Sequence, residues 1–256
     1  MQDVEDVGPS APNATESTEL TSLRRAIGVI CAWPQDALRY DTALGLAAVA
    51  RRVKLTGELA ACTARIKSWA LKDVDHPMAT FIDARRAHRT NLERLAKRSI
   101  PKPGEKRRDV NTIVWRAFHC DRLPFDDVAW AYATGHMRDG GGYYTTHALW
   151  ALSFLRDKKC RDPGAVEAAI LELRKELSEA QAKTAELSTT QDIDLFAEQL
   201  LMRLLAGAPR EQLRPELTRL LKTQRDDGAF GVEGESGPWV LHATTLGAWI
   251  LAIFLD

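Results

Sequence analysis

The sequence predicts an all-α protein, and three observations support this prediction. Apolar residues recur at spacings of three and four over most of the chain after residue 20, the pattern of helices that bury one face. Alternation of apolar and polar residues, which is typical of strands, is scarce. Proline and glycine punctuate the chain in stretches such as "AWPQD", "RLPFDD" and "AGAPREQ", which indicate turns or helix starts.

These signals place the helices in order along the chain. We expect helices at 20–33, 39–54, 56–73, 77–98, 109–119, 125–137, 145–157, 163–186, 190–206, 210–223 and 239–254. The two acids of "PFDDVAW" suit a first turn because they complement the helix dipole. Helix 163–186 is long and charged, with Glu–Lys and Glu–Arg pairs four residues apart, which favours an exposed outer position.

The domain organisation follows from composition. Residues 1–20 are acidic, contain Ser, Thr and Pro and have few large apolar side chains, so we expect a flexible N-terminal tail. Residues 21–256 are predicted to form one domain, which is long enough to bury a sizeable core.

Four alanine-rich helices resemble one another. Aligning them on Ala43, Ala148, Ala197 and Ala243 gives steps of 105, 49 and 46 residues, the first being about twice the others. A repeat of this size is that of a helical hairpin, and such repeats usually form a stacked or closed array. Small residues on the packed face let these helices approach closely around a shared centre.

Two stretches carry a family resemblance. "QRDDGAFG", at 224–231, resembles the Q-x-x-D-G-x-W/F repeat of squalene and oxidosqualene cyclases. "YYTTHALWAL", from residue 143, is similar to the inner helices of that family and of protein prenyltransferase β-subunits. The resemblance, clearest over 125–157 and 213–256, implies an α/α-toroid of about six helical hairpins around a central cavity. An irregular helical bundle or an open solenoid is the alternative.

Glycine turns precede two of the predicted inner helices. Glycine is favoured where the chain turns tightly with positive φ. We expect Asp139 and Asp227 to accept backbone hydrogen bonds across these turns. Thr145 and Thr146 are expected to cap the helix that follows the first turn.

Two histidines are the starting point for a functional site. His147 and His242 each stand immediately before an anchoring alanine, so they occupy equivalent positions in the first turn of two inner helices. The toroid would place them at the rim of its cavity, where histidine can transfer protons or bind metal. A hydrogen-bonded structural histidine is the alternative. The predicted catalytic residues are His147, Tyr144 and Asp139, and the predicted binding residues are His242, Asp227, Trp239 and Trp150.

Several chemistries lack their motifs. The sequence has neither the D-x-C zinc motif of prenyltransferases nor the D-x-D-D acid of hopene-type cyclases, and D-D-x-x-D is absent too. It has no G-x-S-x-G and no phosphate-binding loop. "HCD", at 119–121, is the nearest cluster of metal-ligand types, but neighbouring helical residues point about 100° apart. The sequence leaves the cofactor unknown, and zinc is possible although no motif supports it.

The predicted function is the binding of a small-molecule or polymer ligand in the cavity, with the rim histidines available for acid–base or metal chemistry. Whether the protein is an enzyme stays open at this stage. One alternative is a non-catalytic module that binds a protein partner. Another is an enzyme like the polysaccharide lyases that place Tyr and His in an incomplete toroid, here Tyr143, Tyr144 and His147.

Charge and hydropathy limit the classes of partner that the sequence predicts. Lys plus Arg and Asp plus Glu both number 35, so nothing points to nucleic acid. We find no apolar run long enough to predict a transmembrane segment. Compartment stays open between export, with the signal removed, and the cytoplasm.

The four cysteines, Cys31, Cys62, Cys120 and Cys160, are far apart and form no C-x-x-C pair. Buried free thiols are the default for Cys31 and Cys62, which lie in apolar helices. Two disulfides are the alternative if the protein is exported.

Overall fold

The computed structural model describes residues 17–72, 79–83, 110–184 and 186–256. Within these ranges the protein is all-α, as predicted, and its only β-type pairing is the isolated bridge between Gln224 and Phe230. Residues 1–16 of the expected tail lie outside the described residues, and of the expected helix at 77–98 only 79–83 are described.

The helices match the predicted order closely. They are α1 (Thr18–Ala32), α2 (Tyr40–Arg52), α3 (Gly57–Ala70), α4 (Ala79–Ile82), α6 (Val110–Phe118), α7 (Asp127–Ala131), α8 (Met137–Asp139), α9 (Tyr143–Lys158), α10 (Pro163–Lys183), α11 (Thr190–Leu205), α12 (Arg214–Leu221) and α13 (Pro238–Leu255). A π-helical turn, Tyr132–His136, joins α7 to α8, so the single helix expected at 125–137 is interrupted.

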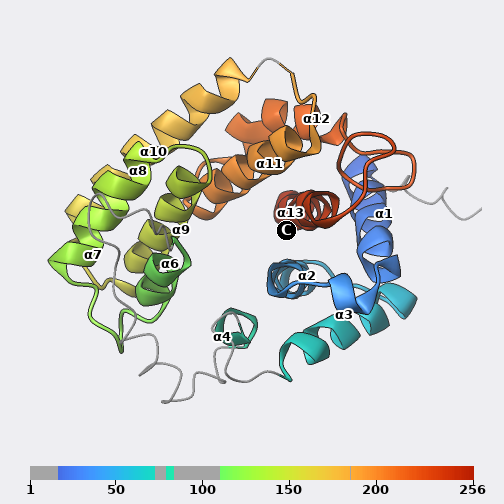
Figure 1. The fold of residues 1–256 in the computed structure, drawn as a ribbon, viewed down its shortest axis with the longest axis horizontal. Helices are drawn as coiled ribbons and strands as arrows, with labels where there is room; N and C mark the ends of the chain where they lie inside the picture. Colours follow the sequence, from blue (N-terminus) through green and yellow to red (C-terminus); the bar gives the residue numbers. More distant parts are fainter. Residues whose placement is uncertain (1–16, 73–78, 84–109, 185) are drawn as a thin grey trace, which may run out of the picture.

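Figure 1 shows two layers of helices. Helices α2, α4, α6, α9, α11 and α13 stand around the centre of the molecule, and α1, α3, α7, α8, α10 and α12 lie outside them. Helix α13 packs between α2 and α11, and α11 packs against α9. The four alanine-rich segments therefore lie side by side in the inner layer, although 105 residues separate the first from the second.

Small residues explain the close packing of the inner layer. Ala43, Ala148, Ala197 and Ala243 are all fully buried. Gly45 of α2 lies so near Thr245 of α13 that a Cβ atom at Gly45 would overlap the threonine side chain. Larger residues at these positions would push the helices apart and open the core.

The sequence analysis predicted no segment long and apolar enough to cross a membrane, but helix α13 meets both criteria. By length and composition alone, Pro238–Leu255 could cross a bilayer. In the fold 67% of this helix is buried, because α1, α2 and α11 pack around it. This is the environment of a central core helix.

Local signals set the ends of the helices. Helix α11 begins with a capping box in which Thr189 and Asp192 bond reciprocally. Helix α9 follows Gly142, whose φ of 51° favours glycine. The predicted caps Thr145 and Thr146 lie inside α9, and the N-cap position is Gly142.

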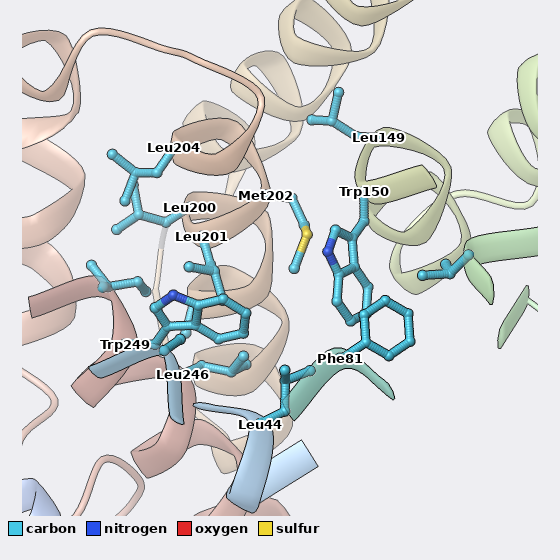
Figure 2. Close-up of a cluster of buried hydrophobic side chains, with 14 of the residues drawn as sticks. Leu44, Phe81, Leu149, Trp150, Leu200, Leu201, Met202, Leu204, Leu246 and Trp249 are labelled. Atoms are coloured by element: carbon cyan, nitrogen blue, oxygen red, sulfur yellow. The ribbon is translucent and has the colours of Figure 1, made fainter. Parts of the chain in front are cut away.

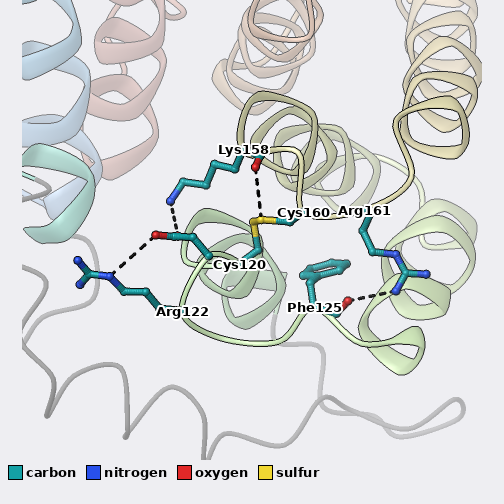
Figure 3. Close-up of a disulfide and its surroundings, with 7 residues drawn as sticks. Cys120, Arg122, Phe125, Lys158, Cys160 and Arg161 are labelled. Atoms are coloured by element: carbon teal, nitrogen blue, oxygen red, sulfur yellow. Dashed lines mark hydrogen bonds and ion pairs between the residues drawn. A yellow bond between two sulfur atoms is a disulfide. The ribbon is translucent and has the colours of Figure 1, made fainter.

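Both pairs of cysteines form disulfides, so the default of free thiols at Cys31 and Cys62 is wrong. The Cys31–Cys62 bond links the end of α1 to α3. The Cys120–Cys160 bond links the segment after α6 to the segment after α9 (Figure 3). Beside it, the Lys158 ammonium bonds Asp121 at 2.7 Å. One crosslink thus joins two outer helices, and the other joins the segments that follow two inner helices.

Candidate functional site

A cavity of about 650 Å³ lies between the inner helices. Its wall combines many aromatic and aliphatic side chains with a few polar ones, a composition typical of ligand sites. It is lined by Leu38, Arg39, Tyr40, Asp41, Leu44, Trp69, Asn111, Trp115, Tyr143, His147, Trp150, Glu198, Met202, Trp239, His242, Thr245, Leu246 and Trp249.

Two acidic residues of α11 organise the polar end. Asp194 is fully buried and Glu198 is 4% exposed. They stand four residues apart, so both side chains project from the same face of α11. Buried carboxylates are costly unless they are paired, and each one here has a histidine partner.

Asp194 joins α11 to α9 and α13. Its Oδ2 accepts a hydrogen bond of 2.6 Å from the Tyr143 hydroxyl, and its Oδ1 lies 2.6 Å from Nδ1 of His242. The Nδ1 atom of His242 is thereby fixed as a donor, which leaves Nε2 facing Asp41 on α2, with 3.8 Å between Nε2 and Oδ2. His242 therefore stands between a buried carboxylate and a more exposed one.

Glu198 holds the second histidine. Its Oε1 lies 3.1 Å from Nδ1 of His147, and it also accepts a hydrogen bond from the Thr146 hydroxyl. The same His147 nitrogen lies 2.7 Å from the backbone oxygen of Tyr143, one turn earlier in α9. The two carboxylate–histidine pairs are neighbours because both acids lie on one face of α11.

These pairings shift the pKa of both histidines upward. Burial by itself would lower the pKa of His242, but the hydrogen bond and charge of Asp194, with the charges of Asp41 and Glu198, raise it to about 9. Burial likewise opposes the charge of His147, and Glu198 overcomes it, so the pKa of His147 is also raised. At neutral pH, His242 is an imidazolium.

The pKa values of Glu198 and Tyr143 shift in the directions that these contacts predict. Burial would raise the pKa of Glu198, but the charge and hydrogen bond of His147 outweigh burial and lower it. The pKa of Tyr143 is raised, first by burial and then by its hydrogen bond to Asp194. Tyr143 is therefore a hydrogen-bond donor at neutral pH and not a base.

One cluster at this end has the spacing of a metal site. Asp194, Glu198 and His242 each offer a ligand atom within 4.8 Å of the others. The 2.6 Å between Asp194 and His242 is the distance of a hydrogen bond, so a metal ion would have to displace the proton between them. The geometry is that of protonated acid–base pairs.

The predicted site residues divide into two groups. His147, His242, Trp150 and Trp239 all line the cavity, as the alignment of the two histidines suggested. Trp239 is 44% exposed and stacks on Tyr143 with 6.1 Å between the ring centroids.

The other three predicted residues do not line the cavity. Asp139 is exposed at the end of α8, and Tyr144 packs against Gly140. Asp227 is ion-paired with Arg225, and its Oδ1 accepts a 2.9 Å hydrogen bond from the backbone N–H of Ala229. Its predicted role in the turn is therefore confirmed, while its predicted place at the cavity is not observed.

Sequence reasoning missed Asp41, Tyr143, Asp194 and Glu198 as one constellation. A signal was present, since "DLFAE", from residue 194, and "YYTTH", from residue 143, each begin and end on polar residues that stand four apart. Acids at this spacing usually lie on a solvated face, so their burial required the neighbouring helices.

No protein-family model, curated protein or solved structure matches this chain.

Proposed function

We propose that this protein is an α/α-toroid that binds a ligand in the cavity between its inner helices and exchanges protons with it through His242 and His147. The observation that carries the proposal is the convergence of two buried carboxylate–histidine pairs on the wall of an aromatic-lined cavity. A protonated His242 whose Nδ1 is held by Asp194 can donate the proton on Nε2 to a bound molecule. The alternation of inner and outer helices supports the toroid.

The same site argues against both alternative functions. A polysaccharide-lyase-like mechanism would need a tyrosine that gives up its proton readily, whereas the raised pKa of Tyr143 opposes this. A module that only binds proteins needs no cavity with converging polar groups. Both alternatives are less well supported than ligand binding with histidine acid–base chemistry.

The test is the retention of a ligand by purified protein. Mass spectrometry of the denatured protein would identify a co-purified molecule, and His147→Gln and His242→Gln should each lose it. His119→Gln is the matched control, because His119 is a buried histidine that does not line the cavity. Elemental analysis of the same samples tests the metal alternative.

Two results would contradict the proposal. One is a wild-type protein that retains no small molecule but co-purifies with a stoichiometric protein partner. The other is a ligand retained equally by both cavity variants, with all variants folded by circular dichroism.

A further inference from the structure

We infer that the ligand of this cavity is a neutral carbohydrate, a short oligosaccharide whose ring faces stack on the aromatic wall and whose hydroxyls bond the polar side chains. The inference rests on the proposed function, because it names the class of molecule that the cavity binds. Three observations carry it: the pairing of charges in the wall, the concentration of aromatic side chains there, and the alternation of aromatic and polar side chains along two helices.

The charged side chains around the cavity are paired with one another. Arg39 Nε lies 3.6 Å from Asp41 Oδ2, and each cavity histidine has its own buried carboxylate. With both histidines protonated, the three basic and three acidic groups of the described chain balance each other. A charged ligand would therefore lose its hydration without gaining a counter-charge, which is costly in a partly enclosed site. The pairing favours a ligand that is neutral but forms hydrogen bonds.

Aromatic side chains are concentrated in the wall of the cavity. Five of the seven tryptophans and two of the four tyrosines of the chain line it. In Figure 2 the rings of Trp150 of α9 and Trp249 of α13 lie towards the same interior region as Met202 of α11, and all three line the cavity. A sugar ring presents C–H groups on its faces and hydroxyls at its edge, so its faces pack well on such flat rings.

One of these aromatic rings is exposed and held in place. Trp239 is 44% exposed and stacks on Tyr143, with 6.1 Å between the ring centroids. The Tyr143 hydroxyl is in turn bonded to Asp194 at 2.6 Å. A ring that is already fixed in orientation loses little further freedom when a flat ligand face packs on it, which favours binding.

Aromatic and polar side chains alternate along the two helices that carry the histidines. On α9, His147 stands four residues after Tyr143 and three before Trp150. On α13, His242 stands three residues after Trp239. Residues at these spacings share one face of a helix, and all five line the cavity. A sugar uses both kinds of group, because its faces stack and its edges form hydrogen bonds, whereas an aliphatic chain uses only the apolar one.

Matched trisaccharides test the inference in titrations followed by calorimetry and tryptophan fluorescence. The cavity volume of about 650 Å³ lies within the roughly 300–1,000 Å³ of small-molecule sites, which suits a short oligosaccharide. Triacetylchitotriose is neutral and the glucosamine trimer is its cationic counterpart. The trimethyl ester of trigalacturonate is neutral and trigalacturonate is its anionic counterpart. Dodecanol is a neutral molecule without rings.

At least one neutral trisaccharide should bind, with one molecule per chain. Both charged trisaccharides should bind at least about tenfold more weakly than the tighter neutral one, because their charge finds no free counter-charge. Dodecanol should bind more weakly than that neutral trisaccharide, because it cannot stack on the aromatic rings.

Aromatic variants test the stacking. Trp239→Ala should weaken the binding of the neutral trisaccharide about fivefold, and Trp239→Phe, which keeps a ring, should weaken it less. Trp130→Phe is the control, because Trp130 does not line the cavity, and it should leave the affinity unchanged. Circular dichroism checks that each variant is folded.

Charge variants test the pairing. Asp41→Asn leaves Arg39 unpaired, so it should improve the binding of trigalacturonate relative to its ester by about threefold at low salt. Arg39→Gln should do the same for the glucosamine trimer relative to triacetylchitotriose. Lys54→Gln, an exposed cation beyond the other end of α2, is the control and should change neither ratio.

The inference is overturned if a charged trisaccharide binds the wild type as tightly as the neutral ones, if dodecanol binds and no trisaccharide does, or if no probe binds. The proposed function is tested separately by the co-purified ligand. An ion or a lipid that co-purifies with the wild type and is lost from His147→Gln and His242→Gln would support the proposed function and overturn this inference.

Discussion

Two histidines in the described part of the chain, His119 and His242, lie in environments that differ mainly in the charge of their neighbours. His119, after α6, is 4% exposed, and its Nε2 lies 3.0 Å from the Thr80 hydroxyl. Burial, assisted by the charge of Lys158, lowers its pKa to about 4. His242 is also largely buried, yet its pKa is raised to about 9. The difference is the carboxylate of Asp194, because burial disfavours the charged imidazole in both places.

This comparison separates a structural histidine from a candidate functional one. His119 is neutral at physiological pH and has a hydroxyl partner, which suits a fixed position in the core. His242 keeps a charge inside the protein, which costs free energy unless it is paired. Buried charge of this kind clusters at functional sites.

The largest expected effect comes from removing the carboxylate that distinguishes the two environments. Asp194→Asn removes the hydrogen-bonded carboxylate of His242, so we expect its pKa to fall from about 9 towards its usual value, while the charges of Asp41 and Glu198 still raise it. The free energy of unfolding should decrease by about 4 kcal/mol, as when a buried pair is broken. NMR titration of the imidazole resonances and urea denaturation measure the two quantities.

Asp121→Asn is the matched control for this change, because Asp121 is the acid that raises the pKa of His119. This residue is half-exposed, so a small shift is expected. A His242 that still titrates near pH 9 in Asp194→Asn would contradict the assigned cause.

The free energy of unfolding should depend on pH through both His119 and His242. The pKa of His242 is raised above its unfolded value of about 6.5, so its contribution is complete below pH 6.5 and is lost as pH rises through about 9. The pKa of His119 is lowered, so its contribution is present above pH 6.5 and is lost as pH falls towards about 4. Each shift corresponds to about 3 kcal/mol, and we expect maximal stability near pH 6.5.

Denaturation across this range, repeated with His242→Gln and His119→Gln, assigns the two limbs. His242→Gln should flatten the alkaline limb and His119→Gln the acidic one. Glu198 and His147 add to the acidic and alkaline limbs respectively, so neither limb disappears completely. Exchange of the two effects, or flattening of both limbs by one variant, would refute the assignment.

The disulfide beside His119 tests how independent the two environments are. We expect Cys120→Ser combined with Cys160→Ser to decrease the free energy of unfolding by about 3–4 kcal/mol, because a 40-residue loop is no longer closed in the unfolded chain. The pKa of His119 should rise towards 6.5 as the loop loosens, while that of His242 stays near 9. An equal shift at both histidines in NMR titrations would show that the two regions are coupled.

The molecule also shows which features can be predicted from the sequence and which cannot. Helix positions follow from local signals such as the Thr189–Asp192 capping box and the glycine before α9, which one segment contains by itself. The equivalence of His147 and His242 follows from the alanine repeat. All three are properties of short stretches read along the chain.

The site needed information from several helices. Tyr143 faces Asp194 and Tyr144 does not, because neighbouring residues of a helix point about 100° apart and the rotation of α9 is set by its packing. In the sequence of its own helix, Glu198 has the pattern of an exposed acid. It is buried because α9 packs against this face of α11. Sequence spacing thus identified the histidine of each carboxylate–histidine pair, whereas the carboxylate could be identified only from the packing of the helices.

The smallest expected effect concerns the neutral partner of His119. Thr80→Val removes the hydroxyl 3.0 Å from Nε2 and should decrease the free energy of unfolding by about 1 kcal/mol, the typical net contribution of one hydrogen bond. Thr80→Ser keeps the hydroxyl and is the control in urea denaturation. The pKa of His119 should stay below 6.5 in both variants, because burial and Lys158 are its main causes and both persist. A rise above 6.5 in Thr80→Val would mean that the hydroxyl, and not the absence of a carboxylate, distinguishes His119 from His242.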